Sequence, residues 1–146
     1  MDLQLAQDLP RICGMQDEIR RVVDIILLNA LQAFEDGGRI TIRTGTTQEQ
    51  QVEVVIADDG PGMSEEVLSR AFEPFFTTKQ VGQGTGLGLS IAYGIVMRHH
   101  GKLTLASRPG EGTTVTLRLP IEPAGASAPA EDGGSGDKRK DSGRGR

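Results

Sequence analysis

The sequence has few of the residues that cross-link chains or stack on bases. Cysteine occurs once, at Cys13, tryptophan is absent, and the aromatic residues are one Tyr and four Phe. A single cysteine excludes an internal disulfide and a cluster of thiolate metal ligands, as is typical of the reducing cytoplasm. We therefore expect a cytoplasmic protein in which Cys13 is buried as a small apolar side chain.

Basic charge and long apolar segments are also scarce. The net charge is −4, so no basic surface is available to neutralise a nucleic-acid backbone. The longest apolar run, residues 22–33, is interrupted by Asp24, Asn29 and Gln32. It falls short of the roughly 20 apolar residues of a membrane-spanning helix, and the start of the chain lacks the basic segment of a signal peptide. We expect no nucleic-acid partner and no membrane segment.

The 146 residues suit one domain followed by a polar tail. Residues 121–146 consist mostly of Ala, Gly, Pro, Ser and charged residues, and Ile121 is their only large apolar side chain. Such a segment buries too little apolar surface to offset the entropy that it loses on ordering. We predict a folded domain at 1–120 and a disordered tail at 121–146.

Apolar periodicity predicts the elements of the folded domain. Spacings of three and four predict a helix over about 17–35, and a second long helix is expected over about 87–100. Alternation predicts strands over 39–43, 103–107 and 113–119, and the short segment 3–5 and the more apolar segment 51–57 are also expected to be strands. We expect Ser64 to cap a short helix that reaches Arg70, and Gly101 to end the second long helix in the left-handed conformation. This order predicts an α+β fold, a two-layer sandwich with helices on one face of a mixed sheet.

Three segments rich in glycine or aromatic residues follow one another between residues 58 and 90. They are DDGPG at 58–62, FEPFFTTK at 72–79 and GTGLGLS at 84–90. The first lets the backbone pass close to a flat ligand, while the Asp58 carboxylate accepts hydrogen bonds from a donor such as an adenine amino group. The third precedes a helix, whose unpaired N–H groups favour an anion such as triphosphate. Each segment alone is usually an ordinary turn, but together they predict a nucleotide site.

In order and spacing these segments, with the helix that carries Asn29, resemble the N, G1, F and G2 boxes of the ATP-binding catalytic domain of sensor histidine kinases. That domain is a branch of the ATPase group that includes gyrase, Hsp90 and MutL. The resemblance implies the Bergerat ATP-binding fold, with ATP and Mg²⁺ as cofactors. It implies that Asp58 binds the adenine amine, that Gly60 and Gly62 allow its close approach, and that Asn29 binds Mg²⁺. Asp59 stands where many members have Asn.

The resemblance also implies contacts from the lid and the glycine turns. Asn29 and Lys79 are the implied catalytic residues, with Lys79 beside the phosphates. In the family, the stretch at 72–79 begins a mobile lid and helps to dock the helix that carries the phosphoacceptor histidine. The other implied nucleotide-binding residues are Phe76, Thr77, Gly84, Thr85, Gly86, Leu87, Gly88 and Thr113.

Ile25 departs from the family pattern. Most members carry a second polar residue one helical turn before the position of Asn29, and in gyrase and Hsp90 a Glu there activates water. Asp24 is about 100° away around the helix and does not replace it. Ile25 therefore argues against a fast ATPase and favours phosphoryl transfer to an outside acceptor.

The two histidines, His99 and His100, are adjacent at a predicted helix end, where histidine often has a structural role. His100 and Gly101 match a place where the family often has His-Gly-Gly, with Lys102 in place of the second glycine. Neither histidine lies in the H-E-x-x-x-P context of a phosphoacceptor, and we expect both to be structural.

The implied function is that of the catalytic domain of a two-component sensor histidine kinase. It would donate the ATP γ-phosphoryl group to a histidine-bearing dimerisation and phosphoacceptor domain outside this chain, and through it to a response regulator. Two other functional classes stay open. A regulatory module of the anti-sigma-factor type would be expected to lack the complete loop at 72–79, and a gyrase-type ATPase clamp is disfavoured by Ile25.

Overall fold

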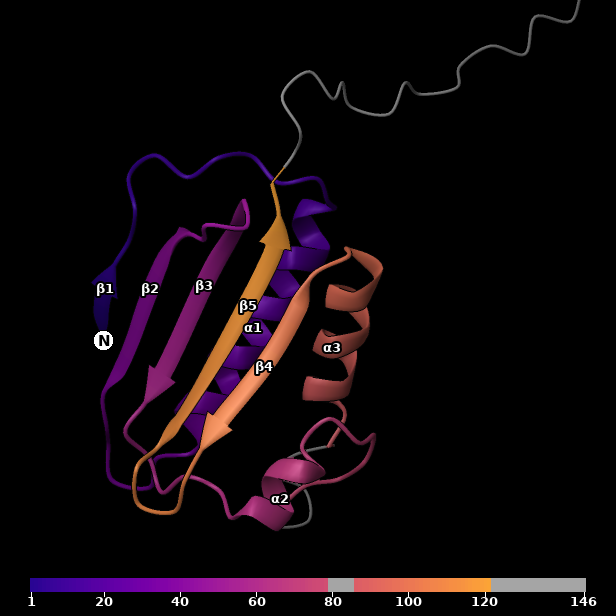
Figure 1. Ribbon diagram of the computed structural model, residues 1–146. Helices are drawn as coiled ribbons and strands as arrows, with labels where there is room; N and C mark the ends of the chain where they lie inside the picture. The colour runs from indigo at the N-terminus through magenta and orange to yellow at the C-terminus, as the bar shows by residue number, and fades with distance from the viewer. Residues whose placement is uncertain (79–85, 122–146) are drawn as a thin grey trace, which may run out of the picture.

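The computed structural model describes residues 1–78 and 86–121. Within them a single mixed sheet has the strand order β1-β2-β3-β5-β4, in which β1 pairs parallel to β2 and the other neighbours are antiparallel. The helices α1 and α3 cover one face of this sheet (Figure 1). The predicted α+β two-layer fold is therefore confirmed. The elements are β1 (Asp2–Gln4), α1 (Gln16–Gln32), β2 (Ile40–Thr46), β3 (Gln51–Asp58), α2 (Glu65–Ser69), α3 (Gly88–Arg98), β4 (Lys102–Ser107) and β5 (Thr113–Pro120).

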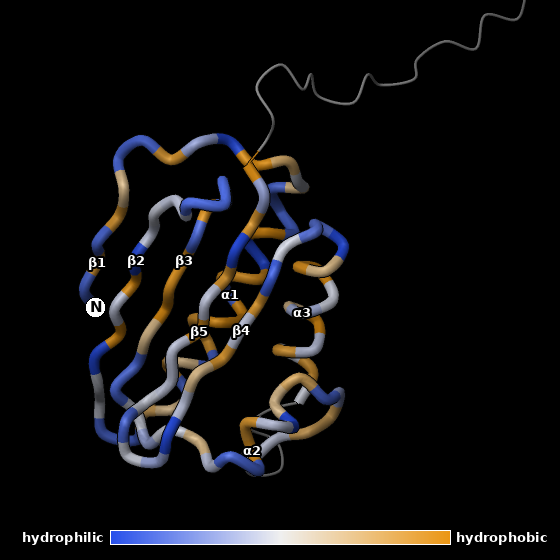
Figure 2. Tube along the Cα trace, in the orientation of Figure 1, coloured by the Kyte–Doolittle hydropathy of each residue, from blue (hydrophilic) through white to orange (hydrophobic). Residues whose placement is uncertain are grey.

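The core lies between the two long helices and the central strands. Val22, Ile26 and Val96 from the helices meet Ile56 and Leu117 from the strands, and all of these side chains are fully or almost fully buried. Burying each one stabilises the fold by roughly 1.5–3 kcal/mol. Figure 2 shows the apolar segments gathered in α1, α3 and β3, whereas β1 is mainly hydrophilic.

Helix α2 begins as the sequence predicts. Ser64 Oγ accepts a hydrogen bond from the Val67 N–H at 3.3 Å, so Ser64 is the predicted N-cap. Helix α1 ends at Gln32, about one turn before the predicted end, and α3 ends at Arg98. Cys13 is exposed, so the expectation that it is buried was wrong.

The predicted cap of α3 was also wrong. His100, with φ 56°, takes the left-handed position that was expected of Gly101. The His100 N–H donates to the Met97 carbonyl at 3.1 Å and the Gly101 N–H to the Val96 carbonyl at 3.0 Å, which is the Schellman pattern. A Cβ at Gly101 would lie 2.5 Å from the Arg118 carbonyl oxygen. Gly101 is therefore needed for close approach to β5.

The predicted tail falls almost entirely outside the described residues and remains a prediction. Ile121, its first residue, forms an isolated antiparallel bridge with Ile12. Within 1–78 and 86–121, the structure contains no helix that combines the length and the apolar character needed to cross a membrane.

Candidate functional site

The sheet face that the helices cover changes from apolar to polar at one end. Cross-strand partners on this face form rows that run across β4, β5, β3 and β2. One row is apolar and consists of Leu105, Val115, Ile56 and Ile42. The next row on the same face consists of Ser107, Thr113, Asp58 and Ile40. Since side chains alternate between the faces of a strand, the polar groups of this row extend the core face beyond its apolar part. In Figure 1 this end of the sheet is the lower one, beside α2.

Asp58 is the last residue of β3, and its carboxylate is held by the backbone. Oδ1 accepts a hydrogen bond from the Gly60 N–H at 3.0 Å, and the Thr113 N–H of the neighbouring strand lies close enough to favour the ionised form. Burial raises the pKa of Asp58; these two N–H groups oppose the rise, and the neighbouring Asp59 charge adds to it. The carboxylate is therefore a positioned and partly desolvated acceptor, as the predicted adenine contact requires.

The neighbouring aspartate, Asp59, has a different role. Its Oδ1 accepts a hydrogen bond from the Arg39 N–H at 2.7 Å, and its own N–H donates to the Arg39 carbonyl at 3.2 Å. Asp59 thus ties the segment that follows α1 to the turn after β3. An Asn in its place could accept the same hydrogen bond, because only one side-chain oxygen is used.

Two glycines pack the turn after β3 against the turn between β4 and β5. Gly62 and Gly112 have φ of 71° and 76°. A Cβ on Gly62 would collide with the Arg108 carbonyl, and a Cβ on Gly112 would collide with the Asp58 carbonyl. Gly60 is also confined, since its Cβ would lie 2.9 Å from Asp58 Oδ1. Packing between turns therefore requires these glycines, and the nucleotide contacts of Gly60 and Gly62 stay predictions.

The aromatic loop is joined to the start of α3. The Phe75 N–H donates to the Gly86 carbonyl at 2.9 Å, and Gly86 has φ 69°. The Phe72 ring lies 5.0 Å from the Tyr93 ring of α3, and the Arg70 guanidinium lies 4.3 Å from the centre of the Phe76 ring. Phe76, a predicted nucleotide contact, therefore has a cation–π partner within the protein.

Phe75 lies in the same loop with its side chain 75% exposed. Thr77 is also exposed, so neither residue is held within the core. The nucleotide contact predicted for Thr77 stays a prediction.

The predicted phosphate-binding helix start lies against α1. A Cβ on Gly88, the first residue of α3, would lie 3.3 Å from Ile25 Cγ2. Asn29 is one turn further along α1 on the same side, and it is partly buried. Leu87 precedes α3 as its N-cap and gives no side-chain cap. The structure thus brings the Ile25 and Asn29 side of α1 to the start of α3.

Three predicted site residues, Lys79, Gly84 and Thr85, lie outside the described residues. Among the residues that the structure does describe, no three His, Cys, Asp or Glu side chains gather into a metal site. The predicted Mg²⁺ ligand, Asn29, would offer a single amide oxygen, and this role stays a prediction. A lone oxygen donor suits Mg²⁺, which usually keeps several waters and is held largely by the phosphates of its nucleotide.

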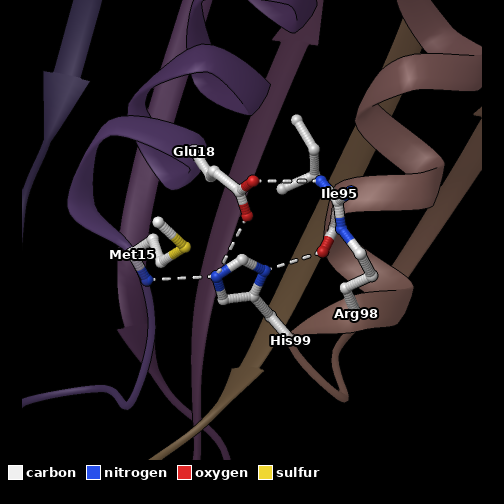
Figure 3. A network of polar contacts seen from close by, with 5 residues as sticks. All are labelled: Met15, Glu18, Ile95, Arg98 and His99. Carbon is white, nitrogen blue, oxygen red and sulfur yellow. Dashed lines mark hydrogen bonds and ion pairs between the residues drawn. The ribbon is translucent and has the colours of Figure 1, made fainter.

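His99 has the structural role that the sequence predicts (Figure 3). Its side chain is 8% exposed; Nδ1 donates to the Ile95 carbonyl at 2.7 Å, and Nε2 accepts from the Met15 N–H at 3.1 Å. Glu18 lies 3.7 Å from Nε2 and also pairs with Arg98 at 3.1 Å. Nδ1 therefore fixes the ring against α3 itself, and Nε2 holds the segment before α1 against the end of α3.

Ser107 is a site residue that the sequence analysis did not identify. Its Oγ accepts from the Met63 N–H at 2.8 Å, donates to the Gly112 carbonyl at 2.8 Å and lies 2.9 Å from Thr113 Oγ1. A signal was present, because alternation along 103–107 places Ser107 on the same face as Leu103 and Leu105. A polar residue at the end of an apolar stripe is a candidate for a site at the edge of the core.

Comparisons with known proteins identify relatives of this domain. The family described as histidine kinase-, DNA gyrase B-, and HSP90-like ATPase matches residues 14–123. Among curated relatives, sporulation kinase E of Bacillus subtilis (strain 168) is 37% identical over 121 residues, and the signal transduction histidine-protein kinase AtoS of Escherichia coli (strain K12) is 39% identical over 122. These matches cover 83% and 84% of this chain but 16% and 20% of the relatives, so the chain spans a small part of their length.

Solved structures of histidine kinases have the same fold. The mycobacterial sensor histidine kinase MprB matches with a TM-score of 0.73 and 28% identity, covering 84% of each chain. The catalytic domain of histidine kinase ThkA matches with a TM-score of 0.70 and 31% identity, covering 82% of this chain and 76% of that one. The chain therefore belongs to the histidine kinase-, DNA gyrase B- and HSP90-like ATPase family, and the relatives that it resembles within that family are sensor histidine kinases.

Proposed function

We propose that this domain binds Mg-ATP and donates the γ-phosphoryl group to a histidine on a separate phosphoacceptor domain, which passes it to a response regulator. The observation that carries the proposal is the Asp58 carboxylate, fixed by the Gly60 N–H at the polar end of the core. Kinship with sensor histidine kinases supports the same reaction. It does not favour the alternative of a regulatory anti-sigma-type module.

The adenine amine is the ligand group that Asp58 would bind. An ionised carboxylate offers about four acceptor sites. The Gly60 N–H uses one of these sites and fixes the orientation of the carboxylate. A donor from the ligand adds a charge-assisted hydrogen bond in a partly desolvated place, where such a bond is stronger than in water.

The phosphates would lie at the start of α3. Gly86, Leu87 and Gly88 form this helix start, where the helix dipole favours anions. Asn29 would give its amide oxygen to Mg²⁺, and the bound ion would neutralise phosphate charge. Lys79, Gly84 and Thr85 belong to the same proposed subsite.

Ile25 favours transfer over hydrolysis. Its side chain is at the start of α3, next to the position of Gly88. An apolar side chain there can neither accept a proton from water nor orient it, so this part of α1 does not promote hydrolysis. A histidine presented by a partner domain brings its own nucleophile, and the site then needs only to position the phosphoryl group and stabilise its charge.

Calorimetry of Mg-ATP binding tests this proposal, with Asp58→Asn as the variant and Asp59→Asn as its matched control. We expect Asp58→Asn to weaken binding roughly 10- to 100-fold, because an amide in place of the carboxylate loses or mispairs a polar contact to the ligand. Asp59→Asn should bind as the wild type does, because an amide oxygen can still accept from the Arg39 N–H. No Mg-dependent binding of ATP to the wild type, or equal affinity in Asp58→Asn, would contradict the proposal.

A further inference from the structure

Three cross-strand neighbours at the end of the sheet share one polar network. Ser107, Thr113 and Asp58 are register partners on β4, β5 and β3 and lie on the same face. Thr113 pairs with Asp58 across β5 and β3, and Thr113 Oγ1 lies 2.9 Å from Ser107 Oγ. Thr113 therefore links the proposed adenine acceptor to Ser107.

The proton of the Ser107 hydroxyl has two possible acceptors, the Gly112 carbonyl at 2.8 Å and Thr113 Oγ1 at 2.9 Å. Gly112 is buried, so leaving its carbonyl without a donor is unfavourable. If Ser107 donates to Gly112, Thr113 must donate its own proton to Ser107. Ser107 Oγ then accepts from Thr113 and from the Met63 N–H. This arrangement uses the one donor and both acceptor sites of the serine hydroxyl.

Thr113 is thereby left as an acceptor toward a ligand. Its hydroxyl proton is committed to Ser107, so the hydroxyl can offer a ligand only its two lone pairs. The Asp58 carboxylate beside it is also an acceptor. The Asp58 and Thr113 side chains therefore offer acceptor groups to a ligand.

We propose that Ser107 is a specificity-determining residue: by holding the Thr113 hydroxyl as an acceptor, it makes the site select a purine with an amino group at position 6 over one with a carbonyl there. This inference rests on the proposed function, since it assumes that the base lies beside Asp58 and Thr113. A carbonyl oxygen at position 6 would meet only acceptors, and unmatched buried polar groups are what make such discrimination large. Ser107 acts through Thr113 and is a positioning residue.

The test compares ATP with inosine triphosphate, which has a carbonyl in place of the 6-amino group and a hydrogen on the neighbouring N1. We expect the wild type to prefer ATP by about 100-fold or more. Ser107→Ala frees the Thr113 hydroxyl to rotate and donate to the carbonyl, so the preference should narrow by about tenfold. Thr104→Ala is the matched control, because it removes a hydroxyl from the exposed face of the same strand, and it should leave both affinities unchanged.

A double-mutant cycle tests the route through Thr113. Thr113→Val removes the hydroxyl while keeping the side-chain shape, and should itself narrow the preference for ATP over inosine triphosphate. In that background Ser107→Ala should narrow it no further. Circular dichroism shows which variants fold, and if Ser107→Ala does not, an unchanged preference in Thr113→Val overturns the inference.

The outcomes separate this inference from the function on which it rests. A wild type that binds no ATP would remove the proposed function and this inference with it. Binding by the wild type together with an equal loss of ATP and inosine triphosphate affinity in Ser107→Ala would overturn the specificity role alone. Ser107 would then only hold the two turns together.

Discussion

The Asp58 carboxylate lies where burial opposes its own charge. Its pKa is raised above the ordinary value because burial outweighs the hydrogen bonds from the Gly60 and Thr113 N–H groups. A carboxyl group whose pKa is higher in the folded than in the unfolded protein binds more protons when folded. The free energy of unfolding therefore falls as the pH rises from the unfolded pKa through the folded one. Without a ligand, ionised Asp58 works against the fold.

Asp58→Asn should therefore make the protein without nucleotide more stable at pH 7, although it weakens ATP binding. The gain should shrink as the pH falls through the raised pKa of folded Asp58 toward the ordinary carboxyl value of about 4, and it should vanish below that, where Asp58 is protonated in both states. Urea unfolding of the two proteins across this pH range measures the difference. A variant that is less stable than the wild type at pH 7, or a difference that does not change with pH, would show that burial is not the dominant influence on Asp58.

The sequence was enough to identify some residues of the candidate site but not others. Asp58 and Asn29 were identifiable because each is a polar residue within a local pattern, a strand end before a glycine turn and an apolar helix. Ser107 was not identified, because its importance depends on Met63, Gly112 and Thr113, which reach it through the pairing of β4 with β5. Likewise, glycine is needed at position 62 because a Cβ there would collide with the Arg108 carbonyl, 46 residues later in the chain.

At the scale of elements, α3 ends on a residue that is poorly suited to its conformation. His100 is exposed and adopts φ 56°, which costs a residue with a Cβ about 1–2 kcal/mol relative to the right-handed region. The neighbouring Gly101 is retained by the close approach of the Arg118 carbonyl. This explains why Gly101 was wrongly predicted to be the left-handed cap. Local rules place glycine at that cap, whereas here the glycine is needed one residue later, where the chain passes close to β5.

His100→Gly should stabilise the protein by about 0.5–1 kcal/mol, because glycine adopts the left-handed cap without a Cβ penalty. His100→Ala is the matched control, since it removes the same imidazole but keeps a Cβ, and it should give no comparable gain. Denaturant unfolding measures both. Equal stabilities of the two variants would show that backbone strain at His100 does not lower the stability of the protein.

Most element positions followed from periodicity alone. The apolar segment 51–57 and the alternation in 113–119 predicted β3 and β5 to within a residue of their ends. The strand order β1-β2-β3-β5-β4 was not predicted, because alternation identifies the buried face of a strand but not its neighbours. The end of α1 was predicted about one turn late, because apolar spacing continued through Ala33 and Phe34 after the helix itself had ended at Gln32.

At the scale of the whole molecule, the domain has histidines but not in a position to accept phosphate. His99 is nearly buried, and both of its ring nitrogens are used in contacts with Ile95 and Met15. His100 lies at the cap of α3, at the opposite end of that helix from Gly88. Phosphoryl transfer depends on positioning the acceptor in line with the γ-phosphate, so we expect the acceptor histidine to come from another domain.

The most direct test is to incubate the chain with radiolabelled ATP and Mg²⁺, alone and with a cognate histidine-bearing helical hairpin. We predict no acid-labile phosphohistidine on the chain alone and labelled hairpin in the mixture. Asn29→Ala should abolish the transfer, because it removes the proposed Mg²⁺ ligand. Label on His99 or His100 of the isolated chain, or no label on the cognate hairpin although ATP binds, would contradict the account.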